Sequence, residues 1–188
     1  MRVIAGEFRS RRLKSIPGND TRPTSDRLRE TLFDILGLRV RGVIFLDAYA
    51  GTGAVGIEAL SRGASHAIFL ERSRRAVETI RENLKSLGLE ARATVVTGPA
   101  LLSIERYPAG IVFLDPPYER EREYAAALDL LSETPRDLVI AQHSIRLALA
   151  ESYGVLKRSR LLRQGDNALS FYTPEPPEPP RDPDPPNS

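Results

Sequence analysis

The chain has 188 residues, of which 41% are hydrophobic and 28% charged, as expected for a single globular domain. It contains no cysteine, which excludes disulfides, thiolate zinc sites, iron–sulfur clusters and cysteine nucleophiles. Its two histidines, His66 and His143, are too few for a multi-histidine metal centre, so we expect no metal and assign neither histidine a role.

The net charge of +2 conceals an uneven distribution along the chain. Residues 1–41 hold ten basic and five acidic residues, and residues 42–173 hold 16 of each. Residues 174–188 hold one basic and four acidic residues. All but three of the 27 basic residues are arginine, whose planar guanidinium binds phosphate oxygens in a bidentate way. The basic segment indicates either phosphate binding or a general preference for arginine, and charge alone does not decide between them.

Both ends of the chain have a distinct composition. Arg2, Arg9, Arg11 and Arg12 interrupt any apolar core of a signal peptide, and no apolar run approaches the roughly 18 residues of a transmembrane helix. We therefore expect a cytoplasmic protein. Residues 174–188 hold eight of the 15 prolines, which predicts an extended, disordered tail.

The first 17 residues predict a small β-hairpin arm with turn points at Gly6 and Ser10. The basic side chains of this arm are Arg9, Arg11, Arg12 and Lys14. Thr24 and Ser25 are N-cap candidates for a helix that ends near Gly37. The apolar stripe of that helix is Leu28, Leu32, Phe33, Ile35 and Leu36.

From residue 43 onward, apolar stretches typical of buried strands alternate with helical patterns. The predicted strands cover residues 43–49, 66–71, 91–97, 110–115 and 137–142. The predicted helices cover residues 54–62, 73–88, about 100–106, about 120–133 and a short segment after 142. Two strand-like stretches around Gly165-Asp166-Asn167 predict a terminal antiparallel hairpin. This order predicts a doubly wound, mostly parallel α/β sheet with helices on both faces.

A glycine-rich loop follows the first predicted strand, with Gly51, Gly53 and Gly56 in the pattern G-x-G-x-x-G. Such a loop lets the backbone approach a ligand, and the helix that follows offers free N–H groups. Glu71 ends the second predicted strand, where a carboxylate can accept ribose hydroxyls. The alternative is a tight strand–helix turn without a ligand. The context favours a nucleoside cofactor and does not say which one.

A second unusual loop, Asp115-Pro116-Pro117-Tyr118, follows the fourth predicted strand. In a doubly wound sheet the first and fourth strands adjoin where the strand order reverses, so both loops should face one crevice. The loop suits methylation of an exocyclic base amine, because the Asp115 carboxylate and the Pro116 carbonyl can accept both amine hydrogens. The nitrogen lone pair is then freed from the ring, and Tyr118 would stack on the base.

These motifs also support a resemblance. AGTGAVGIEALSRGA (50–64) and DPPY (115–118) resemble class I S-adenosylmethionine-dependent methyltransferases, and RPTSDRLRETLFDIL (22–36) resembles the RsmD family. The resemblance covers about residues 1–173. It implies a seven-stranded Rossmann-like methyltransferase sheet and methylation of the exocyclic N2 amine of one guanine in small-subunit (16S) ribosomal RNA.

Because DPPY also occurs in adenine-N6 methyltransferases of RNA and DNA, that reaction stays open as an alternative. A NAD-dependent oxidoreductase with the same glycine pattern is a less favoured one, as is a non-catalytic RNA-binding module. We expect three parts: a basic arm (1–21), the methyltransferase domain (22–173) and the tail (174–188). We also expect a monomer whose partner is 16S rRNA or the assembling small subunit.

The resemblance implies a role for individual residues of this chain. The cofactor-binding residues it implies are Asp47, Ala50, Gly51, Thr52, Gly53, Glu71, Arg72, Ala100, Asp115 and Thr24. The residues it implies for the target amine are Asp115, Pro116, Pro117 and Tyr118. The RNA-binding residues that we expect are Arg9, Arg11, Arg12, Lys14 and Arg22. In one departure from the family, Pro99 stands near the position of an aspartate that binds the cofactor adenine.

Overall fold

The computed structural model describes residues 1–16, 26–117, 121–134 and 136–175. The predictions for four single residues, Arg22, Thr24, Ser25 and Tyr118, and for tail residues 176–188 concern parts of the chain outside these ranges. The first two residues of the predicted tail are ordered, because Pro174 ends a strand and Glu175 N donates to Val155 O (2.8 Å).

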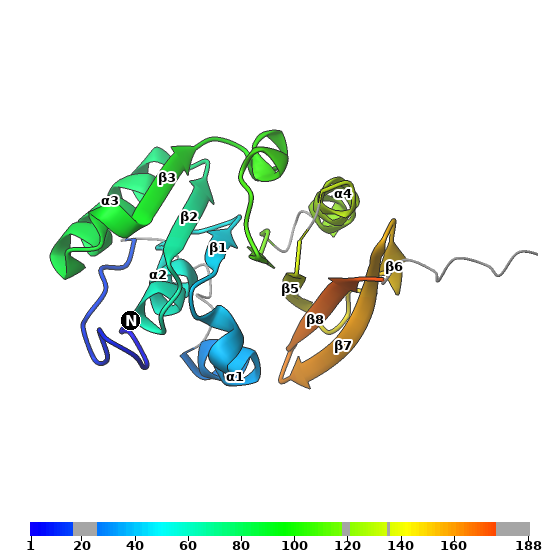
Figure 1. Ribbon diagram of the computed structural model, residues 1–188, viewed down its shortest axis with the longest axis horizontal. Helices are drawn as coiled ribbons and strands as arrows, with labels where there is room; N and C mark the ends of the chain where they lie inside the picture. The colour runs from blue at the N-terminus through cyan, green and yellow to red at the C-terminus, as the bar shows by residue number, and fades with distance from the viewer. Residues whose placement is uncertain (17–25, 118–120, 135, 176–188) are drawn as a thin grey trace, which may run out of the picture.

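The described strands form one sheet of eight in the order β3-β2-β1-β4-β5-β8-β7-β6 (Figure 1). Their bounds are β1 Ile44–Asp47, β2 His66–Glu71, β3 Ala93–Thr97, β4 Ile111–Leu114, β5 Leu138–Ser144, β6 Ser152–Tyr153, β7 Leu156–Gln164 and β8 Asn167–Pro174. Strands β1 to β5 pair in parallel, whereas β8 is antiparallel to both β5 and β7. The doubly wound, mostly parallel sheet with a terminal hairpin is confirmed. The eighth strand was not expected: β6 is a two-residue edge strand paired with the start of β7.

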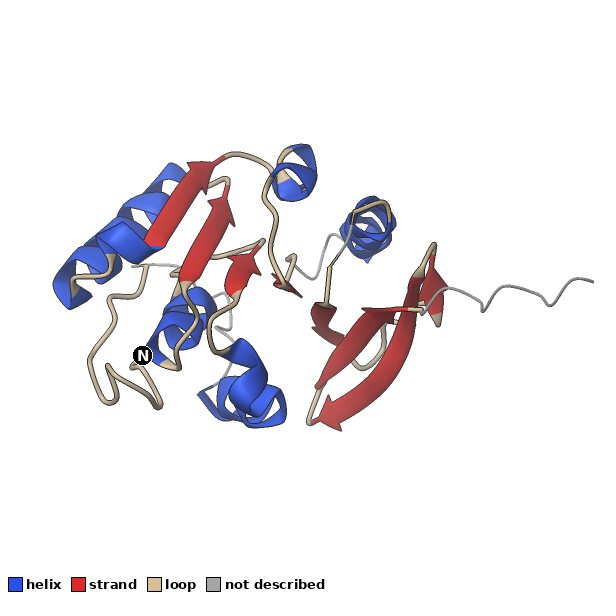
Figure 2. Cartoon of the chain, in the orientation of Figure 1, coloured by secondary structure: helices blue, strands red, loops and turns tan. Residues whose placement is uncertain are grey.

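Helices cover both faces of this sheet (Figure 2). The α-helices are α1 Asp26–Leu36, α2 Ala54–Ser61, α3 Arg74–Leu87 and α4 Glu121–Ser132. The short 3-10 helices are η1 Gly37–Val40, η2 Glu90–Arg92, η3 Ala100–Leu102 and η4 Ile104–Arg106. Helices α1, α2 and α3 pack on one face, and α4 packs with η3 and η4 on the other. None of the described helices is long and apolar enough to cross a membrane.

The predicted helix boundaries agree closely with the structure for α1, α2 and α3. The Ser73 hydroxyl accepts a hydrogen bond from Ala76 N (3.4 Å), and Gly88 has the left-handed φ of 68° that ends α3. The predicted stripe of α1 is buried except for Ile35, which is partly buried against the same core.

One helix prediction holds in part and another is wrong. Residues 100–106 form two short 3-10 helices, η3 and η4, in place of a single helix. No helix follows residue 142, because β5 continues to Ser144 as it pairs with β8. The chain then turns, with Ile145 N donating to Asp166 O (3.0 Å).

The N-terminal segment forms the expected hairpin-like turn and packs on the domain. Arg2 and Arg12 form an isolated antiparallel bridge, and both expected turn residues, Gly6 and Ser10, have positive φ angles of 82° and 68°. Val3 and Leu13, at 1% and 6% exposure, belong to the same hydrophobic core as α1, α2 and α3. The path of this segment is therefore set by the body of the protein.

Gly56 lets α2 pack closely against Phe69 of β2. A Cβ atom added there would lie 2.3 Å from Phe69 Cε1. We therefore expect Gly56→Ala to lower the free energy of unfolding by about 1–3 kcal/mol, as overpacked cores do. Urea denaturation measures the loss. In a Phe69→Leu background the same change should cost less, and an equal cost in both backgrounds would show that the ring is not the obstacle.

Candidate active site

The two loops singled out in the sequence leave the same edge of the sheet. Strands β1 and β4 are parallel neighbours, with Asp47 paired to Phe113 in register. Ala48 N donates to Phe113 O over 3.0 Å, so the pairing continues past the end of β1. The loop after Asp47 and the loop that begins at Asp115 are therefore side by side, which confirms their predicted convergence.

The glycine loop is a tight turn between β1 and α2. Gly51 and Gly53 have φ angles of 54° and 78°, and Gly53 N donates to Ala50 O over 2.7 Å. A Cβ atom added at Gly51 would meet no atom within 4 Å. The backbone at Gly51 thus faces open space, where a ligand can approach it.

Glu71, at the end of β2, holds this loop in place. Its Oε2 accepts a hydrogen bond from Gly51 N (2.9 Å), and its Oε1 accepts one from Ser73 N (2.8 Å). Each carboxylate oxygen has two lone pairs, so both oxygens can accept a further hydrogen. The partly buried carboxylate therefore fits a ligand that presents two adjacent hydroxyl groups, as a ribose does.

Asp47 is a buried acid, 1% exposed, at the end of β1. Its Oδ2 accepts a hydrogen bond from Gly56 N in the first turn of α2 (3.0 Å). Burial raises the pKa of Asp47 to about 7; the Gly56 N–H opposes this rise, and the negative charges of Asp115 and Glu71 add to it. Asp47 thus lies close enough to Asp115 and Glu71 to be affected by their negative charges, in surroundings that favour a positively charged ligand.

Asp115 is held from the neighbouring strand. Its Oδ2 accepts a hydrogen bond from Gln142 Nε2 (3.2 Å), and Gln142 is only 4% exposed. The Tyr124 hydroxyl donates to the Gln142 backbone oxygen (2.6 Å) and lies 3.4 Å from Pro116 O. Gln142 and Tyr124 therefore position the start of the loop.

The sequence analysis missed both positioning residues. A signal existed for Gln142, which is a polar residue inside the otherwise apolar strand β5. Tyr124 carried none, because an aromatic residue on the buried side of a helix is usually core.

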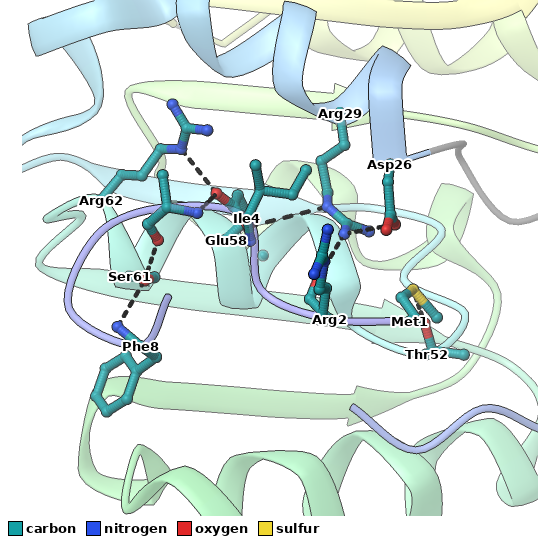
Figure 3. A network of polar contacts seen from close by, with 12 residues as sticks. Met1, Arg2, Ile4, Phe8, Asp26, Arg29, Thr52, Glu58, Ser61 and Arg62 are labelled. Atoms are coloured by element: carbon teal, nitrogen blue, oxygen red, sulfur yellow. Dashed lines mark hydrogen bonds and ion pairs between the residues drawn. The ribbon is translucent and has the colours of Figure 1, made fainter. Parts of the chain in front are cut away.

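The remaining candidate residues lie around this edge. Ala50 and Ala100 are buried, Ala100 at the start of η3 directly after Pro99. Gly98 N donates to Glu71 O (3.0 Å), which places the end of β3 beside Glu71. Arg72 is exposed to solvent. The Thr52 hydroxyl lies 3.8 Å from Met1 Sδ of the N-terminal segment (Figure 3).

The basic N-terminal segment reaches the glycine loop through Asn83 of α3, which is 1% exposed. Asn83 Oδ1 accepts from Lys14 N (2.7 Å), and its Nδ2 donates to Lys14 O (3.2 Å) and Thr52 O (3.1 Å). The sequence analysis placed no role on Asn83. The structure does not bring Arg9, Arg11, Arg12 or Lys14 into the carboxylate cluster.

The family model described as Conserved hypothetical protein 95 matches residues 1–173. The chain belongs to this family, the RsmD family of methyltransferases. Over 181 residues it is 37% identical to YlbH of Bacillus subtilis (strain 168), which covers 92% of this chain and 98% of that protein. Over 121 residues it is 39% identical to Ribosomal RNA small subunit methyltransferase D of Escherichia coli (strain K12), covering 64% of this chain and 61% of that protein.

Solved structures agree with this family assignment. The structure of yhhF from Escherichia coli has a TM-score of 0.81 and 32% identity, and the match covers 93% of this chain and 98% of that chain. An RNA methyltransferase from Salinibacter ruber, solved in complex with S-adenosyl-L-homocysteine, has a TM-score of 0.65 over 85% of this chain and 97% of that chain, at 18% identity. The second match concerns the fold alone. The RsmD-family methyltransferase fold is thus shared with relatives of known structure.

The raised pKa of Asp47 predicts a specific pH dependence of stability. The folded state binds this proton more tightly than the unfolded state, whose carboxyl has its usual value of 3.8. The contribution of Asp47 to the free energy of unfolding is therefore fully present below about pH 4. It falls by about 4 kcal/mol in all as the pH rises to about 7. Urea denaturation of Asp47→Asn should show a flatter profile over that range than the parent protein. The exposed Asp129→Asn is the control, and parallel profiles for parent and Asp47→Asn would contradict the assignment.

Proposed function

We propose that this chain transfers a methyl group from S-adenosylmethionine to the exocyclic N2 amine of a guanine in small-subunit (16S) ribosomal RNA. The observation that carries the proposal is the adjacency of the glycine loop and the Asp115 loop at one edge of the sheet. A nucleoside site and an amine-accepting site then adjoin, as methyl transfer between two bound molecules requires. The name of the Escherichia coli relative supports ribosomal RNA of the small subunit as substrate.

The residues present fit S-adenosylmethionine. Glu71 would accept the ribose hydroxyls, and the open backbone at Gly51 would lie against the methionine part. Asp47 and Asp115 add negative charge, which suits a cationic sulfonium. The Pro99 side chain offers no hydrogen bond to adenine. Backbone groups around Ala100 would therefore bind the adenine end of the cofactor. The sulfonium supplies a methyl group that is already activated.

The Asp115 loop would hold the amine. The Asp115 carboxylate accepts one amine hydrogen and the Pro116 carbonyl the other, which frees the nitrogen lone pair. Pro116 O keeps this capacity, because the Tyr124 hydroxyl donates to Gln142 O at the shorter distance. Gln142 Nε2 fixes the direction of the Asp115 carboxylate, which would stabilise the positive charge that develops on nitrogen as the nitrogen–methyl bond forms and the sulfur–methyl bond breaks. The methylated amine would then lose one proton to solvent. Tyr118 would stack on the base.

Other readings make different predictions. Adenine-N6 methylation would use the same Asp115 loop and differs in the product nucleoside. A NAD-dependent oxidoreductase would use the glycine loop, but it has no use for a carboxylate and carbonyl aimed at an amine. The family relationship favours the methyltransferase. We propose that the enzyme works as a cytoplasmic monomer on 16S rRNA or on the assembling subunit.

Asp115→Ala should abolish methyl transfer while the fold is retained. We expect the rate of tritium transfer from labelled S-adenosylmethionine to small-subunit rRNA to fall at least about 100-fold, as when one electrostatic stabiliser is removed. Asp129→Ala, at an exposed position on α4, is the control. Mass spectrometry of the digested RNA should show N2-methylguanosine made by the parent protein. Normal transfer by Asp115→Ala would refute its role, and N6-methyladenosine would replace guanine with adenine as the target.

Glu71→Gln should weaken cofactor binding. A hydrogen bond to a charged group contributes about 1.5–3 kcal/mol, so the dissociation constant for S-adenosylmethionine should rise about 10-fold or more. Isothermal titration calorimetry measures this, with the exposed Glu78→Gln on α3 as control. The parent protein should bind S-adenosylmethionine and not NAD. If the parent protein binds NAD and does not bind S-adenosylmethionine, the site belongs to a NAD-dependent oxidoreductase instead.

A further inference from the structure

The basic N-terminal segment is anchored by its backbone, not by its charged side chains. The buried Glu58 carboxylate accepts hydrogen bonds from Ile4 N (2.8 Å) and Ala5 N (3.0 Å) (Figure 3). Ser61 accepts from Glu7 N through its backbone oxygen (2.8 Å) and from Phe8 N through its hydroxyl (3.0 Å). Because these contacts use main-chain groups, the basic side chains are left to face outward from a fixed support.

The fully buried Arg29 completes this anchor from α1. Its Nη2 donates to Arg2 O (2.6 Å) and to Asp26 Oδ1 (3.0 Å), and its Nε lies 3.9 Å from Glu58 Oε2 (Figure 3). The segment is thus tied to both α1 and α2. Its surface is preorganised, so a ligand that binds there pays little to order it.

The basic side chains of this segment divide into two faces. On the face toward α3, Arg11 Nη2 donates to Ser86 O (3.1 Å) and Lys14 Nζ pairs with Glu82 Oε2 (3.2 Å). Both groups are therefore already engaged with the protein.

The face toward α1 is different. Here Arg2, Arg9 and Arg12 of the segment and Arg27 of α1 line two adjoining hollows of about 590 and 270 Å³. All four arginines are exposed, and within the described part of the chain no carboxylate forms an ion pair with any of them. We call this surface the arginine hollow.

Two acids border the arginine hollow, against its four arginines. Asp26 lies on its wall but pairs with the buried Arg29 (3.0 Å). Glu30 is the other acidic lining residue. Four exposed guanidinium groups around a concave surface match the planar, bidentate recognition of phosphate oxygens.

We propose that the arginine hollow binds the phosphate backbone of the RNA substrate through Arg2, Arg9, Arg12 and Arg27, and that Arg11 and Lys14 take no part. The inference rests on the proposed function for RNA as the partner. It divides the four arm residues that the sequence analysis grouped together and adds Arg2 and Arg27 to the interface. Met1 lines the hollow and lies 3.8 Å from the Thr52 hydroxyl of the glycine loop. The hollow therefore lies on the same side of the protein as that loop.

The test compares double variants that remove the same charge from the two faces. The probe is a fluorescein-labelled RNA hairpin, since phosphate contacts do not depend on sequence, and the readout is fluorescence anisotropy at several salt concentrations. Arg9→Gln/Arg12→Gln and Arg2→Gln/Arg27→Gln should each weaken binding. Each should reduce the slope of log affinity against log salt by about 1.4–1.8, from about 0.7–0.9 per contact.

The matched control is Arg11→Gln/Lys14→Gln. It removes two charges, as each of the hollow variants does, so the change in net charge is the same. Its slope of log affinity against log salt should nevertheless stay at the parent value, because neither side chain contacts phosphate. Equal slopes for the two faces, a larger loss from the control, or no RNA binding by the parent protein at low salt would overturn the proposal. Unchanged urea midpoints establish that the variants are folded.

These outcomes are separable from the proposed function. Binding is measured without cofactor, so it does not depend on which base is methylated. If the parent protein methylates rRNA and the hollow variants bind RNA as the parent does, the enzyme assignment stands and the arginine hollow fails. If the hollow variants lose binding while the parent methylates nothing, the hollow stands and the assigned reaction fails.

Discussion

The parallel pairing of β1 with β4 is the constraint on which the candidate active site depends. It brings together two loops that are more than 60 residues apart in the chain and makes Asp47 and Asp115 electrostatic neighbours. Each loop begins with an acid, Asp47 or Asp115, at or just after the end of its strand. Side by side, they form one edge at which two ligands can meet. The strand order that reverses between β1 and β4 is therefore the structural basis of the site.

Two buried acids show how differently this fold treats negative charge. Glu58 is surrounded by cations and donors: Arg62 Nε lies 2.7 Å from its Oε1, Arg29 is nearby, and two backbone N–H groups bind it. Asp47 accepts a hydrogen bond from Gly56 N, and burial, followed by the charges of Asp115 and Glu71, raises its pKa. Glu58 is thus satisfied within the protein, whereas Asp47 carries an unfavourable charge of the kind found at functional sites.

Much of the fold could be predicted because its signals are local. The apolar runs of the strands, the cap at Ser73 and the glycine pattern at Gly51 each depend on neighbours in sequence. Glu71 was also found this way, since its distance from the glycine loop is typical of nucleoside-binding folds. Its two hydrogen bonds to backbone N–H groups in the structure agree with its predicted place beside that loop.

The features that were missed depend on distant partners. Residues 143–144, where a helix was expected to begin, continue β5 because β8 pairs with them from the far end of the chain. Gln142 gained its role only when β4 brought Asp115 beside it. The division of the basic segment into two faces required the positions of α1 and α3, which no local pattern contains.

The Glu58 anchor has a consequence for how such a protein can evolve. It holds the segment by N–H groups that every residue except proline possesses, so it does not depend on side-chain identity at Ile4 or Ala5. Outward-facing positions nearby can then exchange charges between species without disturbing the attachment. Substitution at these positions can therefore change the charge of the surface while the candidate active site stays unchanged.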